Sequence, residues 1–211
     1  MKTINFIKLL KDYKIVIPPI QRDYAQGRQT GKIPYIRNRF LNEIFNVLSQ
    51  RNGSVLNLDF IYGFIAKDER YGKELVTFKP LDGQQRLTTV FLIHWFVLSK
   101  EIKDEAKLQE MKTLLYDFSY ATRNSSSDFC EKLVEYRPIF NFESISKEIE
   151  DQPWFYSSWK SDPTIDSMLI MLDAIQKKYS EYIEPQLSIK DLPGIWQYLE
   201  DDSSSIIFHL L

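Results

Sequence analysis

The 211-residue chain has 27 basic and 29 acidic side chains, a formal net charge of −2, and 44% hydrophobic residues, as expected of a globular protein with a substantial core. The length fits one large domain or two small ones. A single Cys excludes an internal disulfide and any multi-cysteine metal site, and the longest apolar run, residues 90–98, is too short to span a bilayer, so we expect a soluble, cytoplasmic protein without membrane contact.

The charge is distributed unevenly along the chain. Residues 1–51 hold ten basic side chains against three acidic ones, about +7, and residues 52–100 hold six against five, about +1. Residues 101–211 hold eleven basic against twenty-one acidic side chains, about −10. The basic N-terminal part suits a polyanion, either a nucleotide or a nucleic acid, or it docks on the acidic half of the same chain.

The first elements expected are a short helix at residues 6–10 and a strand at 14–17, which ends at Pro18-Pro19. Residues 20–32 contain two glycines and are expected to form a loop. This loop is unusually rich in amides and guanidiniums around an aromatic ring: Gln21, Arg22, Asp23, Tyr24, Gln26, Arg28 and Gln29. Such a set suits recognition of phosphates together with a base or sugar, and the alternative is an ordinary solvated loop.

A helix is expected from Pro34 to about residue 50. Its apolar stripe would consist of Ile36, Phe40, Ile44, Val47 and Leu48, with Arg37, Arg39 and Arg51 off the stripe. Residues 56–66 and 74–81 are expected to be strands of a hairpin, and Gly63 indicates a bulge or a close backbone approach. Three strands and two helices within about one hundred residues predict a small α/β core.

The hairpin leads into Asp82-Gly83, a pair that favours a tight turn. Apolar residues then recur at helical spacing, so a helix should begin near Gln84. Its first turn carries two amides, Arg86 and two threonines, all hydrogen-bond donors. A glycine turn before a donor-rich helix start predicts an anion site, because free N–H groups and the helix dipole point at one spot. The alternative is an ordinary helix start with a surface Arg.

After residue 100 the pattern becomes mainly helical. Helices are expected at residues 101–118, 126–136, 142–149, 164–181 and 189–200. The aromatic residues Trp154, Phe155, Tyr156 and Trp159 are expected to pack between helices rather than to stack on bases. After the serines at 203–205, residues 206–211 look like the start of a strand whose apolar residues would form an exposed edge, so we expect a chain that is truncated at its C-terminus.

Several familiar chemistries find no support in the sequence. The chain has two histidines, His94 and His209, and His94 is expected in the core because it lies on an apolar stripe. There is no His-rich metal site, catalytic triad signature or P-loop motif. Cys130 is expected to be an inert thiol with a raised pKa. What remains are the amide-rich loop, the Asp-Gly-Gln-Gln-Arg turn, and Asp82, which either binds Mg²⁺ beside a phosphate or serves only as a turn residue.

Two segments carry a family resemblance. Ile-Pro-Pro-Ile-Gln-Arg-Asp-Tyr at 17–24 and Leu-Asp-Gly-Gln-Gln-Arg-Leu-Thr-Thr at 81–89 resemble the GmrSD-type restriction endonuclease N-terminal domain family, which is related to the ParB/sulfiredoxin fold. Tyr62-Gly63 lies where the family has a strand glycine, whereas Gln26 replaces a Trp found in many members. The resemblance implies an α+β fold, with a ParB/sulfiredoxin-like nucleotide-binding core at residues 1–100 and a mostly α-helical extension at 101–211.

The resemblance also implies a function. The expected protein is a nucleotide-binding, NTP-hydrolysing regulatory domain of a bacterial restriction system for phage defence, which uses Mg²⁺ with a nucleoside triphosphate. Family members commonly carry a separate nuclease domain of the His-Asn-His type, which nothing here matches, so DNA cleavage would reside in a downstream domain or a partner chain. Sulfiredoxin chemistry would require a Cys in the turn motif, where Gln84 and Gln85 stand instead.

From the residue types of both motifs and the resemblance together, we expect specific roles for individual residues. The expected nucleotide-binding residues are Gln21, Arg22, Tyr24, Gly83, Gln84, Gln85, Arg86 and Thr88. The helix start would hold the phosphates, Gln21 and Arg22 would close over them, and Tyr24 would support the base or sugar. Asp82 would orient a metal or water, so Asp82 and Arg86 are the expected catalytic residues. The alternatives are a non-catalytic DNA-binding module that uses the same basic loop, and a scaffold in which the turn only joins strand to helix.

Overall fold

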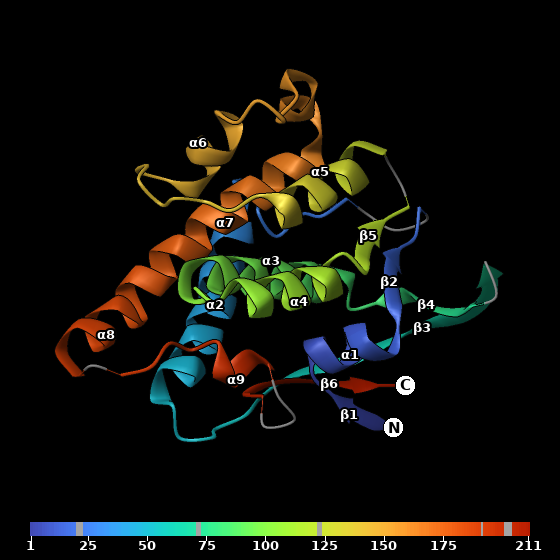
Figure 1. The fold of residues 1–211 in the computed structure, drawn as a ribbon, viewed down its shortest axis with the longest axis horizontal. Coiled ribbons are helices and arrows are strands. Elements are labelled where there is room, and N and C mark those ends of the chain that lie inside the picture. Colours follow the sequence, from blue (N-terminus) through green and yellow to red (C-terminus); the bar gives the residue numbers. More distant parts are fainter. Residues whose placement is uncertain (20–22, 71–72, 122–123, 191, 201–203) are drawn as a thin grey trace.

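The computed structural model describes residues 1–19, 23–70, 73–121, 124–190, 192–200 and 204–211. Within these residues, six strands form one mixed sheet in the order β1-β6-β3-β4-β2-β5, and helices pack against it (Figure 1). The strands are β1 (Lys2–Ile4), β2 (Lys14–Ile17), β3 (Leu56–Arg70), β4 (Lys73–Asp82), β5 (Phe118–Tyr120) and β6 (Ile206–Leu210). The helices are α1 (Phe6–Asp12), α2 (Ile33–Gln50), α3 (Gln84–Glu101), α4 (Glu105–Leu115), α5 (Asn124–Glu135), α6 (Ile145–Glu150), the 3₁₀ helix η1 (Ser157–Ser161), α7 (Pro163–Tyr182), α8 (Glu184–Lys190) and α9 (Gln197–Glu200). The expected α+β class is confirmed.

Two strands of the sheet, β5 and β6, lie after residue 100 in the sequence. β5 lies at one edge beside β2, and β6 lies inside the sheet, antiparallel to β1 and parallel to β3. The expectation that the terminal strand forms an exposed apolar edge is therefore wrong: Ile206, Phe208 and Leu210 are buried. Residue 100 marks where helices become predominant, but the sheet itself is built from both sides of it.

The β3–β4 hairpin reaches beyond the rest of the sheet (Figure 1). Its register shifts between Tyr62 and Gly63, and a Cβ at Gly63 would run into the backbone of Lys79 and Pro80. Gly63 therefore lies at both a bulge and a close approach, as the sequence predicts. The hairpin ends at Asp82 and passes directly into α3.

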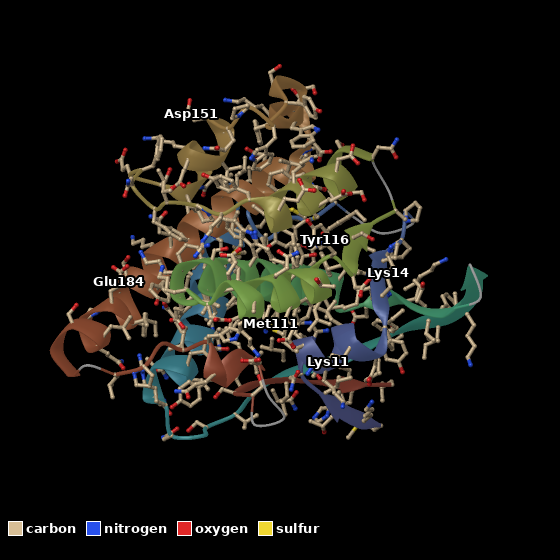
Figure 2. The ribbon with its side chains drawn as sticks, viewed as in Figure 1. Lys11, Lys14, Met111, Tyr116, Asp151 and Glu184 are labelled. Atoms are coloured by element: carbon tan, nitrogen blue, oxygen red, sulfur yellow. The ribbon has the colours of Figure 1, made fainter. Side chains whose placement is uncertain are left out.

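Helix α3 lies at the centre of the molecule (Figure 1) and is buried on every side from Leu87 to Ser99. A helix of this kind carries apolar residues all round rather than along one stripe. Other helices cover it: α7 packs against α3, and α4 packs against both α3 and α1. Met111 of α4, labelled in Figure 2, is buried in this packing. The position fixes the first turn of α3 rigidly at the end of β4.

Helix α2 has the expected extent but a different buried face. Its buried residues are Arg37, Leu41, Ile44, Phe45 and Leu48. Ile36, expected on the apolar stripe, is 52% exposed, and Arg37, expected off it, is buried. The physical reason is that the neighbouring loop offers carbonyl groups to the guanidinium of Arg37, which outweighs the simple apolar periodicity.

The helices after residue 100 mostly match the expected segments, with two corrections. The expected helix at 101–118 ends at Leu115, because Phe118–Tyr120 pairs with β2 as strand β5. The expected helix at 189–200 is wrong: α8 and α9 are separate, with Pro193 and Gly194 between them. The aromatic cluster packs as predicted, since Trp159 and Phe155 are buried and their rings meet edge to face at 5.6 Å. Within the residues that the structure describes, no helix is long and apolar enough to cross a membrane.

Candidate functional site

The turn between β4 and α3 depends on Gly83. Its φ of 89° lies in the left-handed region, and a Cβ added there would stand 2.5 Å from Cγ2 of Ile61 on β3. Glycine is favoured for both reasons, since it adopts positive φ without cost and leaves room for Ile61. The carbonyl of Gly83 accepts the N–H of Leu87 at 2.8 Å, so the helix begins at once. The expected helix start near Gln84 is confirmed.

The first turn of α3 keeps its N–H groups without a side-chain cap. Helices α4, α6 and α7 have Asp104, Ser144 and Asp162 as N-cap residues, and each of these side chains accepts a hydrogen bond from the first turn. The N-cap residue of α3 is instead Gly83, and no side chain of the described residues caps this helix. The N–H groups of its first turn and the positive end of the helix dipole are therefore left for another acceptor.

Arg86 stabilises an irregular part of strand β3. Its guanidinium donates to the carbonyl of Leu58, to the carbonyl of Phe60 at 2.7 Å and to Oδ2 of Asp82 at 3.3 Å. These carbonyls flank Asp59, whose φ is 70°, at the place where the β3–β6 register shifts. Arg86 thus satisfies backbone groups that the irregular strand leaves free, as the scaffold reading of this motif expects.

Asp82 and Arg86 come together as an i,i+4 ion pair at the start of α3. The side chain of Asp82 is 55% exposed and that of Arg86 22% exposed, so the carboxylate faces solvent while most of the guanidinium is covered. Within the described residues, no group of three or more His, Cys, Asp or Glu side chains could hold a metal ion. A single exposed carboxylate fits a Mg²⁺ that arrives with a nucleotide, because Mg²⁺ in such sites takes one or two carboxylates, phosphate oxygens and water.

The two glutamines of the motif have different partners. Gln84 donates to the carbonyl of Leu81 at 2.7 Å and closes the turn on itself. Gln85 reaches the loop at residues 23–29: its Oε1 accepts the N–H of Ala25 at 2.8 Å, and its Nε2 donates to the carbonyl of Asp23 at 3.1 Å. The side chain of Gln85 therefore fastens the amide-rich loop beside the start of α3.

Tyr24 lies beneath the loop surface. It is fully buried, and its hydroxyl lies 2.8 Å from Oγ1 of Thr89, which in turn donates to Oε1 of Gln26 at 2.5 Å. Burial raises the pKa of Tyr24, so its hydroxyl stays protonated. The structure thus places Tyr24 as an internal brace of the loop, and any influence on a base or sugar would pass through Thr89 and Gln26.

Thr88 does not reach the helix start. It is fully buried, and its hydroxyl lies 2.7 Å from the hydroxyl of Tyr120 on β5. It therefore faces the core, on a different side from the turn that Asp82 and Arg86 form. Gln21 and Arg22, expected to close over the phosphates, lie outside the described residues.

Arg37 is a site residue that the sequence pattern missed. It is buried, and its guanidinium donates to the carbonyls of Gly27 at 2.7 Å and Arg28 at 3.3 Å and to Oε1 of Gln29 at 3.2 Å. Burial lowers the pKa of Arg37, but the ordinary pKa of a guanidinium lies so far above neutral pH that the side chain remains charged. Its spacing on α2 gave no signal, because its partners are carbonyls of a loop whose position the sequence leaves open.

The loop also touches α7. A Cβ at Gly27 would run into the backbone of Ser167, and the N–H of Tyr24 donates to Oγ1 of Thr164 at 3.4 Å. The loop at residues 23–29 is therefore held on three sides, by α2, α3 and α7. A pocket of about 230 Å³ opens beside it, lined by Ala25, Gln26, Ile33, Ile36, Arg37 and Gln85.

His94 lies in the core, as expected, and Cys130 is buried as well. His94 is buried, with Nδ1 2.7 Å from the carbonyl of Val90 and Nε2 3.3 Å from that of Leu199. Burial lowers the pKa of His94 to about 4, so the ring is neutral at neutral pH. Burial, and then the negative charge of Asp162, raise the pKa of the Cys130 thiol, which is therefore unreactive.

A comparison with models of protein families gives a match. The family model described as GmrSD restriction endonuclease, N-terminal domain, matches residues 6–210. The match covers nearly the whole chain and includes both the loop and the turn motif. None of the curated proteins compared with the chain matches it.

Proposed function

Because the chain belongs to the GmrSD restriction endonuclease N-terminal domain family, it is a component of a restriction system, and we propose that it is the system's nucleotide-binding, NTP-hydrolysing regulatory domain. The nuclease activity would belong to another domain or a partner chain. The single observation that carries this proposal is the uncapped first turn of α3, which follows Gly83 and stands beside Asp82 and Arg86. Such a helix start offers N–H groups and positive potential to a phosphate.

In the Asp-Gly-Gln-Gln-Arg motif, the side chains have a structural role and the backbone N–H groups would have the binding role. Gln84, Gln85 and Arg86 use their side chains to hold the turn, the loop and strand β3. Their backbone N–H groups are those of the first turn and would bind the phosphates. The motif can therefore be a scaffold and a binding site at once, so the scaffold contacts do not oppose the proposed function.

Asp82 and Arg86 would both help to neutralise the negative charge of the phosphates, Arg86 directly and Asp82 through a bound Mg²⁺. Arg86 adds a positive charge at the helix start, and the exposed carboxylate of Asp82 would hold a Mg²⁺ that comes with the nucleotide or orient an attacking water. A bound Mg²⁺ would supply neutralisation of the phosphate charge. The protein's own contribution is to fix this carboxylate and the N–H groups on a helix buried in the core, where they need little reorganisation.

A DNA-binding module using the same loop has less support. In the described part of the loop, the guanidinium of Arg28 lies 3.7 Å from the carboxylate of Asp23. The guanidinium of Arg37, on the neighbouring helix α2, donates its hydrogen bonds to loop carbonyls. Few cations of this segment are therefore available for a DNA backbone, which binds through many phosphate contacts.

Measuring NTP turnover tests the proposal, with and without duplex DNA, for the wild-type chain and for Asp82→Asn. The substitution keeps the size of the side chain and removes its negative charge. We expect turnover in the wild type and a loss of at least about tenfold in Asp82→Asn. If the chain binds the triphosphate but does not hydrolyse it, with or without duplex DNA, it is a nucleotide sensor. That result would contradict the hydrolytic part of the proposal.

A further inference from the structure

The pocket beside the loop has the size of a ring system. Its volume is about 230 Å³, and it is lined by residues of three segments: Ala25 and Gln26 of the loop, Ile33, Ile36 and Arg37 of α2, and Gln85 of α3. Pockets that enclose a whole drug-sized ligand measure roughly 300–1,000 Å³. This pocket is smaller, so it would hold one flat ring system rather than a complete nucleotide.

Its walls are mainly apolar. Ala25, Ile33 and Ile36 contribute aliphatic carbon, and Ile36 remains 52% exposed although it stands on a helix with an ample buried face. The polar ends of Gln85 and Arg37 are engaged with the loop backbone, so both present flat groups whose hydrogen bonds are already made. Aliphatic walls and flat amide and guanidinium groups are the surroundings that an aromatic heterocycle packs against.

One polar group of the pocket is still available. The Oε1 atom of Gln26 accepts a hydrogen bond from Thr89 at 2.5 Å. In the part of the chain that the structure describes, the amide nitrogen of Gln26 has no partner among the observed contacts. It can donate to a ring nitrogen or carbonyl, and its orientation is fixed because Thr89 holds the other end of the amide.

The pocket adjoins the proposed phosphate site. Gln85 lines it and is also the second residue of α3, so one residue belongs both to the pocket and to the uncapped first turn. We propose that this pocket binds the heteroaromatic base of the nucleoside triphosphate whose phosphates lie at the start of α3. The inference rests on the proposed function, and it adds a residue set for the base: Ala25, Gln26 and Ile36.

Comparing a nucleoside triphosphate with inorganic tripolyphosphate tests this inference, because tripolyphosphate has the phosphates but no base. Calorimetric titration in Mg²⁺ would use the 211-residue chain, Ala25→Leu, which fills the pocket, and Ile36→Ser, which removes an apolar wall. Ile139→Ser is the matched control, since Ile139 is 65% exposed and is not among the residues that line the pocket. Circular dichroism and thermal unfolding would confirm that each variant is folded.

The expected result is a loss of about tenfold or more in affinity for the nucleoside triphosphate in Ala25→Leu and Ile36→Ser, with tripolyphosphate binding unchanged in both. Ile139→Ser should match the wild type for both ligands. If both pocket variants bind the nucleoside triphosphate as the wild type does, the base lies elsewhere and the inference fails while the proposed function stands. A parallel loss of tripolyphosphate binding would also overturn it. If the wild type binds neither ligand, the proposed function itself fails.

Discussion

Oε1 of Gln85 accepts a hydrogen bond from the backbone N–H of Ala25 at 2.8 Å, across 60 residues of sequence. Nε2 of the same side chain donates to the carbonyl of Asp23 at 3.1 Å, and this second contact joins the two motifs that carry the family resemblance. It also brings the pocket, the loop and the start of α3 together, since Gln85 belongs to the helix and lines the pocket. Gln85 is therefore one of the side chains that hold the loop against the start of α3, together with Tyr24 and Gln26, which contact Thr89.

We predict that Gln85→Leu lowers the free energy of unfolding by about 1–3 kcal/mol, because the N–H of Ala25 and the carbonyl of Asp23 lose their partner while the volume stays similar. Urea denaturation measures this change. Gln109→Leu is a matched control on the exposed surface of α4 and should change stability by less than about 0.5 kcal/mol. Equal small effects of both substitutions would show that Gln85 does not hold the loop.

Arg86→Ala should have two effects. It leaves the carbonyls of Leu58 and Phe60 without their donor, so the free energy of unfolding should fall by about 1–3 kcal/mol. It also removes a positive charge from the proposed phosphate site, so triphosphate affinity should fall roughly ten- to a hundredfold, and Arg86→Lys should restore only part of either loss. Urea denaturation and calorimetry separate the two. Lower stability with unchanged triphosphate affinity would assign Arg86 to the scaffold alone.

Gly83→Ala should cost more stability than Gly31→Ala. Both glycines have positive φ, 89° and 58°, so each substitution places Ala in the left-handed region at a cost of about 1 kcal/mol. Gly31 has open space around it, whereas a Cβ at Gly83 meets Ile61 at 2.5 Å. The difference between the two unfolding free energies therefore measures the close approach of β3. A cost at Gly83 no greater than at Gly31 would show that this approach is not tight.

His94 predicts a specific dependence of stability on pH. Its folded pKa is lowered from 6.5 to about 4 by burial, so between those values the unfolded chain binds a proton that the folded chain does not. Stability should therefore fall as the pH falls from about 6.5 towards 4, by an amount on the order of 3 kcal/mol. His94→Gln removes this titration. Unfolding free energies of the two proteins that run parallel over this pH range would show that His94 is not held neutral.

The local features of the site could be predicted from the sequence. Asp82-Gly83 before an apolar periodic segment is a short-range signal, and the turn, the helix start and the hairpin before it all form where the pattern places them. The burial of His94 also follows from the apolar stripe on which it lies. These predictions need only residues that are neighbours in the sequence or on one helix face.

The predictions that were wrong concern residues whose partners lie far away in the sequence. Arg37 is buried because loop carbonyls receive its guanidinium, and β6 is covered because β1 pairs with its outer side. Neither partner can be identified from periodicity. Ile36 is exposed for the same reason, since the contacts of α2 with the loop and α7 decide which of its apolar residues are buried. Pairing between segments far apart in sequence is the information that a single sequence lacks.

The most direct test of the account is a calorimetric titration of the chain with a Mg²⁺–nucleoside triphosphate, the corresponding monophosphate, and duplex DNA over a range of salt concentrations. A phosphate site at the start of α3 predicts triphosphate binding at least about tenfold tighter than monophosphate binding, with little DNA binding at moderate salt. The contradicting result is tight duplex binding without triphosphate binding, in which the logarithm of affinity falls with that of salt by about 0.9 per phosphate contacted. That result would make the domain a DNA-binding module.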